Sequence, residues 1–389
     1  MILEENPLRV DLIIENLMNF LPERDLKNCR LVSTQWYFPA TKALQKSAKP
    51  ITFGSLYKVN LIRLKPDLET IKLFMSTMEA SPYIVPYVKF DLRPNVLAPN
   101  CLSLMDEFFT NFGPVITQLS ISLAYESSDT FPKRCFPLLN LENLKTLEFC
   151  NSLCGELHPA LTTELLTTRY NLLETILHAA PNLETLSLWA DSENVAWPGE
   201  AIEVLRLAEL PKLRNLKISF PMTNYQLVNL SRVNVQLTSF IFLIREPTFN
   251  TESLYKILAS QANSLTNLKL VDLQCDQVKF LELPVMPKLK HFEVEGAFYG
   301  DHCRLSLLNF NFEKIPKIEK IILRNCHSRN LDLGSLLCGT GASRSLLEFH
   351  ATAAHDFMNS KVIQEIPKIF PNLKNLHVMF SPEAKDSIF

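Results

Sequence analysis

Glycine is scarce in this chain: it makes up 9 of 389 residues, about 2%, where a globular protein usually has roughly 7%. The common phosphate-binding patterns GxxxxGK[ST] and GxGxxG are both missing, and the single GxG is Gly339-Thr340-Gly341. Such loops need glycine because their backbone amides surround a phosphate closely. The composition therefore argues against a nucleotide-dependent enzyme.

An excess of one charge and long apolar runs are also missing. The net charge is −2, from 39 basic and 41 acidic residues without long runs, which excludes the electrostatic footprint of a nucleic-acid or anionic-membrane binder. The longest strongly apolar stretch, Phe240 to Ile244, is far shorter than the roughly 20 residues of a membrane helix. The first residues contain acids and no basic segment, unlike a signal peptide. We therefore expect cytoplasmic and/or nuclear localisation, with neither nucleic acid nor membrane as a partner.

The cysteines do not form a convincing framework for disulfides or metal. There are nine, an odd number, scattered along the chain, which suits a reducing compartment. Cys150, Cys154 and His158 share a four-residue spacing. A structural zinc site needs four ligands with tighter paired spacing, and no fourth ligand is near. We predict no metal and no cofactor.

Leucine, in contrast, is about one residue in six, and it recurs in the pattern LxxLxL. The clearest copy is Leu183-Glu-Thr-Leu186-Ser-Leu188. Eleven copies follow one another in ten steps that average about 29 residues. They start at Val85, Ile116, Leu144, Leu183, Leu213, Leu237, Leu265, Leu289, Ile318, Leu346 and Leu373. This period and pattern are typical of leucine-rich repeats.

The segments between these copies have helical spacing. Residues 250–262 combine a capping residue with apolar positions at Leu254, Ile257 and Leu258, and residues 162–179 carry a similar leucine face. Several copies are preceded by proline two residues earlier, where it can end a helix without removing a sheet hydrogen bond. The sequence predicts an α/β fold in which residues 85–389 form a curved solenoid of about eleven repeats, with a parallel sheet on the concave face and helices on the convex face.

The first fifty residues break this period. Ile13, Leu17 and Leu21 fall on one face of a predicted helix, which Pro22 should end, and Asp25 could cap a second helix. We expect a trihelical unit that is too small to be stable alone and therefore exposes apolar surface to a partner.

A stretch of about 40 residues resembles the F-box family. The resemblance is most specific in residues 20–36, FLPERDLKNCRLVSTQW, which keep Leu-Pro, Asp-Leu, Cys, Val-Ser and Trp in family order and spacing. Two positions depart from that pattern: Arg9-Val10 replaces the opening Leu-Pro, with Pro7-Leu8 just ahead, and Pro39 lies in the expected third helix. The resemblance divides the chain into an F-box at residues 1–48, a linker and solenoid cap at 49–84, and the repeats.

The resemblance also implies a partner and a contact surface. F-box proteins with leucine-rich repeats join the Skp adaptor and cullin scaffold of an SCF ubiquitin ligase, while their repeats hold the target protein. The resemblance therefore implies a subunit that is not an enzyme and has no catalytic residues. The residues expected to contact the adaptor, or to pack behind that surface, are Pro7, Leu8, Ile13, Ile14, Leu17, Met18, Leu21, Pro22, Leu26, Val32 and Trp36.

A candidate target-binding site follows from the alternation of LxxLxL. Positions +2, +4 and +6 from each start should point out of the concave sheet, and most of them are polar. The apolar exceptions lie close together in the array, with two lysines beside them, as in a protein-binding centre. They are Trp189, Ile241, Leu243 and Val271, with Lys217 and Lys269. Covering loops, a covering helix or a register shifted by one residue would equally explain them.

Three functions remain open. The first is an SCF substrate receptor, the second an interaction scaffold that recruits no degraded target, and the third a small-molecule-sensing F-box receptor. His350 and His377 occupy equivalent positions in successive repeats, about 5 Å apart if their strands are neighbours. They lack the further ligands or the nucleophile that a metal or catalytic site needs, so we interpret them as exposed polar residues.

Overall fold

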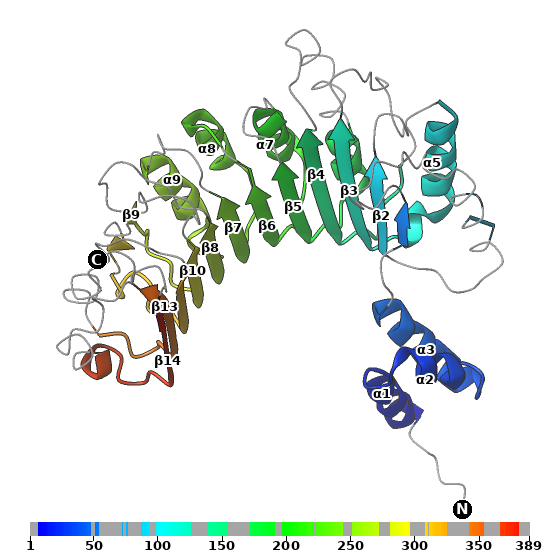
Figure 1. Cartoon of the computed structure of the whole chain (residues 1–389), viewed down its shortest axis with the longest axis horizontal. Coiled ribbons are helices and arrows are strands. Elements are labelled where there is room, and N and C mark those ends of the chain that lie inside the picture. Colours follow the sequence, from blue (N-terminus) through cyan, green and yellow to red (C-terminus); the bar gives the residue numbers. More distant parts are fainter. Residues whose placement is uncertain are drawn as a thin grey trace, which may run out of the picture.

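In a computed structural model of the chain, the described residues are 7–47, 51–53, 72, 75–76, 87–92, 99–125, 139–153, 172–190, 197–220, 222–243, 251–271, 281–295, 308–309, 311–324, 342–353 and 366–380. A twelve-stranded parallel sheet, whose strands follow one another in chain order, curves through most of them (Figure 1). Its strands are β1 (Ile51–Phe53), β2 (Tyr87–Leu92), β3 (Gln118–Tyr125), β4 (Thr146–Leu153), β5 (Thr185–Ala190), β6 (Asn215–Ser219), β7 (Ser239–Leu243), β8 (Asn267–Val271), β10 (His291–Glu295), β12 (Lys320–Arg324), β13 (Glu348–Ala353) and β14 (Asn375–Phe380). Two short strands, β9 (Leu281–Glu282) and β11 (Leu308–Asn309), pair separately.

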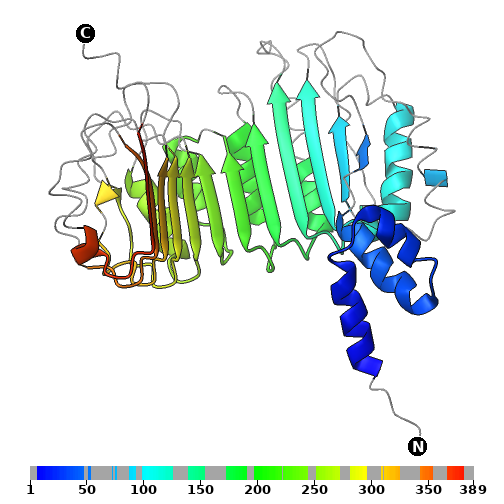
Figure 2. The ribbon, with the colours of Figure 1, turned by 60° about the horizontal axis from the view of Figure 1, so that its bottom comes forward.

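Helices cover the convex side of the sheet, and none of the described helices between β2 and β14 lies on its concave side (Figures 1 and 2). The convex elements are α5 (Pro99–Phe112), the 3-10 helix η2 (Gly113–Val115), helical residues 172–179, α7 (Trp197–Leu207), α8 (Asn224–Leu230), α9 (Thr251–Gln261) and the helical turn at 366–369. Their apolar faces and the inner side chains of the strands form one continuous core. The predicted α/β architecture, with parallel strands returning through convex helices, is confirmed.

Each of the eleven LxxLxL starts lies two residues before a strand of this sheet, from β2 to β14. The alternation is also confirmed: in β5, Leu186 and Leu188 are fully buried, while Thr185 and Ser187 are half-buried. Strand β1 lies in the segment predicted to be a linker and cap, and it pairs with β2. The period of the sequence therefore coincides with the strands.

Two positions depart from the expected alternation. Ser120 occupies an outward position on β3 but is buried. Leu376 occupies an inward position on β14 and is 45% exposed, because β14 is the last strand of the sheet among the described residues and has a neighbour on one side only. Equivalent inward residues on β2 to β13 lie between two neighbouring strands.

Backbone and asparagine hydrogen bonds join each repeat to the next. The carbonyl of Lys145 accepts hydrogen bonds from the amides of both Glu184 and Thr185, each at 2.9 Å. The side-chain amide of Asn182, just after Pro181, donates to the carbonyl of Glu142 at 2.7 Å. Buried or partly covered backbone groups need such partners, so these contacts hold neighbouring strands in register. Parallel register is what aligns the outward residues in rows.

The N-terminal helices form a three-helix unit: α1 (Pro7–Met18), α2 (Glu23–Cys29) and α3 (Thr34–Ser47). The unit has a core of its own, separate from the core of the sheet. This core consists of Ile14, Met18, Leu26, Cys29, Ala40, Ala43 and Leu44.

The expected ends of the first two helices need correction. Helix α1 ends at Met18, before Pro22, and Pro22 is itself the N-cap of α2. The carbonyl of Pro22 accepts hydrogen bonds from the amides of Asp25 and Leu26, both at 3.0 Å. Asp25 therefore lies inside the first turn of α2 and does not cap it. Proline has no N–H to continue the ladder of α1, but its extended conformation suits the start of the next helix.

Candidate functional site

Four apolar residues were predicted to point out of the concave face, and the structure places all four there. Trp189, at the end of β5, is 41% exposed. Ile241, Leu243 and Val271, on β7 and β8, are half-buried. The described helices between β2 and β14 lie on the opposite side of the sheet and do not cover these residues (Figure 1).

The strand register shows which of these residues meet. Ile241 is paired with Lys269, and Leu243 with Val271. Lys217, which is exposed on β6, is paired with Ile241. Trp189 is not part of this group, since it is paired with Ser219 of β6, which separates it from β7. The predicted site is thus one compact group plus an isolated tryptophan.

A shallow hollow of about 330 Å³ lies on the concave face across β7, β8, β10 and β12. Its lining combines apolar and polar side chains, among them Ile241, Ile322, Lys269 and Glu293. The hollow is therefore continuous with the compact group and extends it toward the C-terminal strands.

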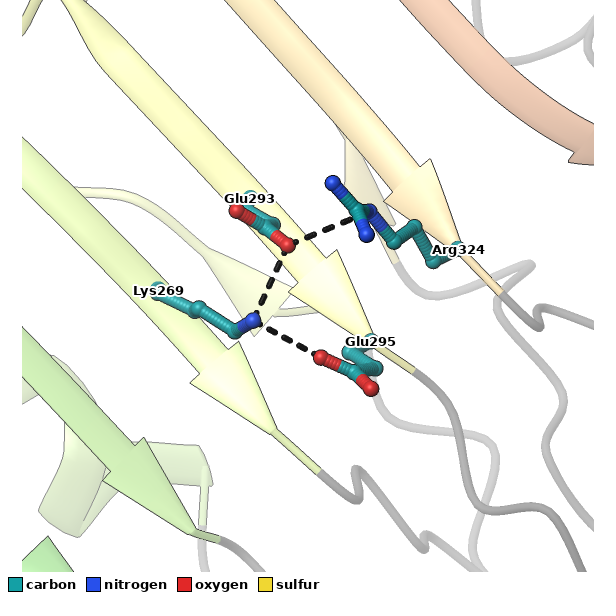
Figure 3. A network of polar contacts seen from close by, with 4 residues as sticks. All are labelled: Lys269, Glu293, Glu295 and Arg324. Atoms are coloured by element: carbon teal, nitrogen blue, oxygen red, sulfur yellow. Dashed lines mark hydrogen bonds and ion pairs between the residues drawn. The ribbon is translucent and has the colours of Figure 1, made fainter.

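Figure 3 shows an ion-pair network at this place, made of Lys269, Glu293, Glu295 and Arg324. The Nζ atom of Lys269 lies 3.0 Å from Oε1 of Glu293 and 2.8 Å from Oε2 of Glu295. Nε of Arg324, on β12, lies 3.4 Å from the same Oε1 of Glu293. Burial opposes the charge of Lys269, but hydrogen bonds and attraction from the two carboxylates outweigh it, so that the pKa of Lys269 is raised.

This network corrects the role expected for Lys269. The sequence suggested a lysine at the rim of an apolar centre, available to a partner, whereas its ammonium group is already matched by two carboxylates. The network residues Glu293, Glu295 and Arg324 were missing from the predicted site. A signal existed, because they occupy outward positions +4 and +6 of the repeats that follow Lys269.

A second polar group lies farther along the concave face. Lys320 and Glu348 form an ion pair at 2.6 Å, and Nε2 of His350 lies 3.5 Å from the same carboxylate oxygen. The hydrogen bond from Lys320 is the largest cause of a lowered pKa at Glu348, with His350 adding to it. The rings of His350 and His377 are 5.6 Å apart, edge to face.

Metal binding gains no support from the described residues, which contain no group of three or more histidine, cysteine, aspartate or glutamate side chains suited to a metal ion. Cys150 is half-buried on β4, whereas Cys154 and His158 lie outside the described residues.

The predicted adaptor residues divide into two sets. Ile13, Leu17, Pro22 and Val32 are exposed. The other set packs inside the three-helix unit or against its core, and comprises Ile14, Met18, Leu26, Leu21 and Trp36. Pro7 and Leu8 lie in the first turn of α1, and their side chains are outside the described part of the chain.

Sequence reasoning missed four further apolar side chains that the three-helix unit exposes. Phe20 is 87% and Leu31 86% exposed, and Leu12 and Phe38 are also on the surface. A helical pattern could not reveal Phe20 and Leu31, because these two residues lie in the turns after α1 and α2. The exposed apolar surface is thus larger than predicted and includes these turns.

None of the helices in the described ranges is both long enough and apolar enough to cross a membrane. Comparison of the sequence with protein-family models and with curated proteins gives no match.

Proposed function

We propose that this protein is the substrate-recognition subunit of an SCF-type ubiquitin ligase. In this proposal, residues 1–48 are an F-box that binds the Skp adaptor and, through it, the cullin scaffold. Residues 85–389 are leucine-rich repeats whose concave face binds a target protein. The protein itself is non-catalytic and acts in the cytoplasm and/or the nucleus.

One observation carries the proposal: a three-helix unit with a separate core exposes large apolar side chains. Ile13, Leu17 and Val32 belong to the segment that resembles an F-box, and all three are exposed. Exposed apolar side chains gathered on one small unit are typical of a protein interface. The buried residues of the same segment, such as Met18 and Leu26, stabilise that surface from behind.

The test is co-purification of the full-length protein with the Skp adaptor. The double variant Ile13→Asp, Leu17→Asp should reduce the adaptor recovered at least about tenfold, because charges in an apolar interface are costly to desolvate. Both side chains are exposed, so the fold should survive, as circular dichroism can verify. The control is Leu207→Asp on α7, where the leucine is similarly exposed but far from the three-helix unit. Undiminished adaptor recovery by the double variant would refute the proposal.

Two alternatives share the adaptor but differ in outcome. A scaffold would bind proteins on its concave face without causing their degradation, so bound partners should not accumulate when the protein is depleted from cells. A small-molecule receptor would need unmatched cations for a polyanionic ligand. Two of the concave cations, Lys269 and Lys320, are paired with carboxylates, and among the described residues Lys217 is a single unmatched cation on β6 rather than part of a basic cluster, which favours a protein target.

A further inference from the structure

Two charged residues on the concave face, Lys217 and Glu295, form fewer ion pairs than the charged residues next to them. Among the described residues, Lys217 forms no ion pair; the nearest carboxylate in its row, on Glu148 of β4, is two strands away, about 10 Å by strand spacing. Glu295 receives one ion pair, from Lys269, whereas Glu293 receives two. Among the outward charges of β6, β7, β8 and β10, Lys217 and Glu295 are therefore the positions where an added opposite charge gains most.

Three aliphatic side chains, together with the ion-paired Lys269, fill the space between these two residues. Ile241 lies beside Lys217, Val271 lies beside Glu295, and Leu243 lies beside Val271. We call Lys217, Ile241, Leu243, Val271 and Glu295 together the β6–β10 patch. It has a cation at one end, a carboxylate at the other and an apolar centre.

The patch has a definite length. From β6 to β10 there are three strand spacings, about 14 Å, and Glu295 lies two residues farther along its strand than Lys217, about 7 Å. The diagonal between the two Cα positions is therefore about 16 Å. Because the sheet curves toward this face, the side-chain tips are closer together than the Cα atoms (Figure 1).

An extended peptide matches these dimensions. Residues i, i+2 and i+4 of a β-conformation project to one side, and i and i+4 are about 13 to 14 Å apart. We propose that the β6–β10 patch binds an extended segment of the target protein, in which an acidic and a basic residue four positions apart flank an aliphatic residue. The acidic residue pairs with Lys217, the aliphatic one packs on Ile241, Leu243 and Val271, and the basic one pairs with Glu295.

The charges next to the patch balance one another, so selectivity depends on the two ends of the patch. The network of Lys269, Glu293, Glu295 and Arg324 contains two cations and two carboxylates, so it attracts neither sign strongly as a whole. A segment with the reversed charge order can still bind by running in the opposite direction. A segment with two acids or two bases meets like charge at one end, which costs affinity. This inference rests on the proposed function, whose target-binding face it specifies.

The experiment selects peptides from a phage-displayed library of random nine-residue sequences on the purified full-length protein. The expected enrichment is an acidic and a basic residue separated by three positions, with an aliphatic residue midway. With Lys217→Glu, the acidic preference should change to a basic one, and the originally enriched peptides should bind at least about tenfold more weakly. With Glu295→Gln, the preference for a basic residue should disappear while the acidic one remains.

The control is Lys212→Glu, which makes the same charge change in the turn before β6, outside the patch, and should leave the selection unchanged. Enrichment without this charge pair, or a pattern that Lys217→Glu does not alter, would overturn the inference. Adaptor recovery is measured on the same preparations. Loss of the peptide pattern with normal adaptor binding refutes the patch alone, and a peptide pattern without adaptor binding refutes the ligase role alone.

Discussion

At the scale of single residues, Lys269 is a residue of the concave face that stabilises the fold through ion pairs. Its ammonium group lies between two carboxylates of the next strand, and its side chain is only 29% exposed. Without this lysine, Glu293 and Glu295, which project from the same face of β10, would lose their shared cation. Lys269 therefore stabilises this part of the concave surface, and together with Arg324 it balances the charge of the two glutamates.

Replacement of this lysine tests its contribution. Lys269→Met should lower the free energy of unfolding by roughly 1 to 2 kcal/mol at pH 7, as for a partly buried ion pair. In the unmodified protein the pKa of Lys269 is raised, so the ammonium's contribution is present at neutral pH and is lost only as the pH rises past its ordinary value and through the raised pKa. Urea denaturation at several pH values measures both effects.

A second lysine variant separates the loss of these ion pairs from the general effect of removing a concave lysine. The matched control is Lys217→Met, which removes a concave lysine that has no ion pair among the described residues, and which should cost less than about 0.5 kcal/mol. Equal losses of stability in Lys269→Met and Lys217→Met would contradict this account.

At the scale of elements, helix α8 is short and depends on its N-terminal cap. The Thr223 hydroxyl accepts a hydrogen bond from the amide of Gln226 at 3.4 Å, and the side chain of Gln226 accepts one from the amide of Thr223 at 2.8 Å. This capping box satisfies two amides that a seven-residue helix would otherwise leave to water. Its inner residues, Leu227 and Leu230, pack into the core of the sheet.

Removal of the cap should destabilise the protein without altering the sheet. Thr223→Ala is expected to cost about 1 kcal/mol, the usual effect of losing a threonine cap. Thr223→Ser, which keeps the hydroxyl, should restore most of that loss. Equilibrium denaturation compares the three proteins, and equal stability of the alanine and serine variants would show that the hydroxyl does not contribute.

At the scale of the whole molecule, the described residues form two separate cores, one in the three-helix unit and one under the sheet. Units with separate cores can open separately. Leu26→Asp places a carboxylate in the smaller core, where the leucine is buried. It should abolish protection from hydrogen exchange in residues 7–47 and leave β5 to β8 protected, as measured by mass spectrometry. Loss of protection in both parts would mean that the two units fold cooperatively.

Much of the architecture could be predicted from the sequence. The LxxLxL pattern placed eleven strands correctly, because alternation and period are local properties of each repeat. The same pattern placed Trp189, Ile241, Leu243 and Val271 on the concave side. The ends of α1 and α2 were less predictable, since Pro22 can end one helix or begin the next, and neighbouring contacts decide between these roles.

The sequence by itself determined which side chains leave the sheet on each face, whereas the tertiary structure decided which of them meet. Lys269 and Glu293 are 24 positions apart, and only the parallel register of β8 and β10 brings their charges together. The same register separates Trp189 from Leu243 by one strand. The physical reason is that alternation is encoded within each strand, while lateral neighbours depend on how successive strands stack and on the hydrogen bonds that hold them in register.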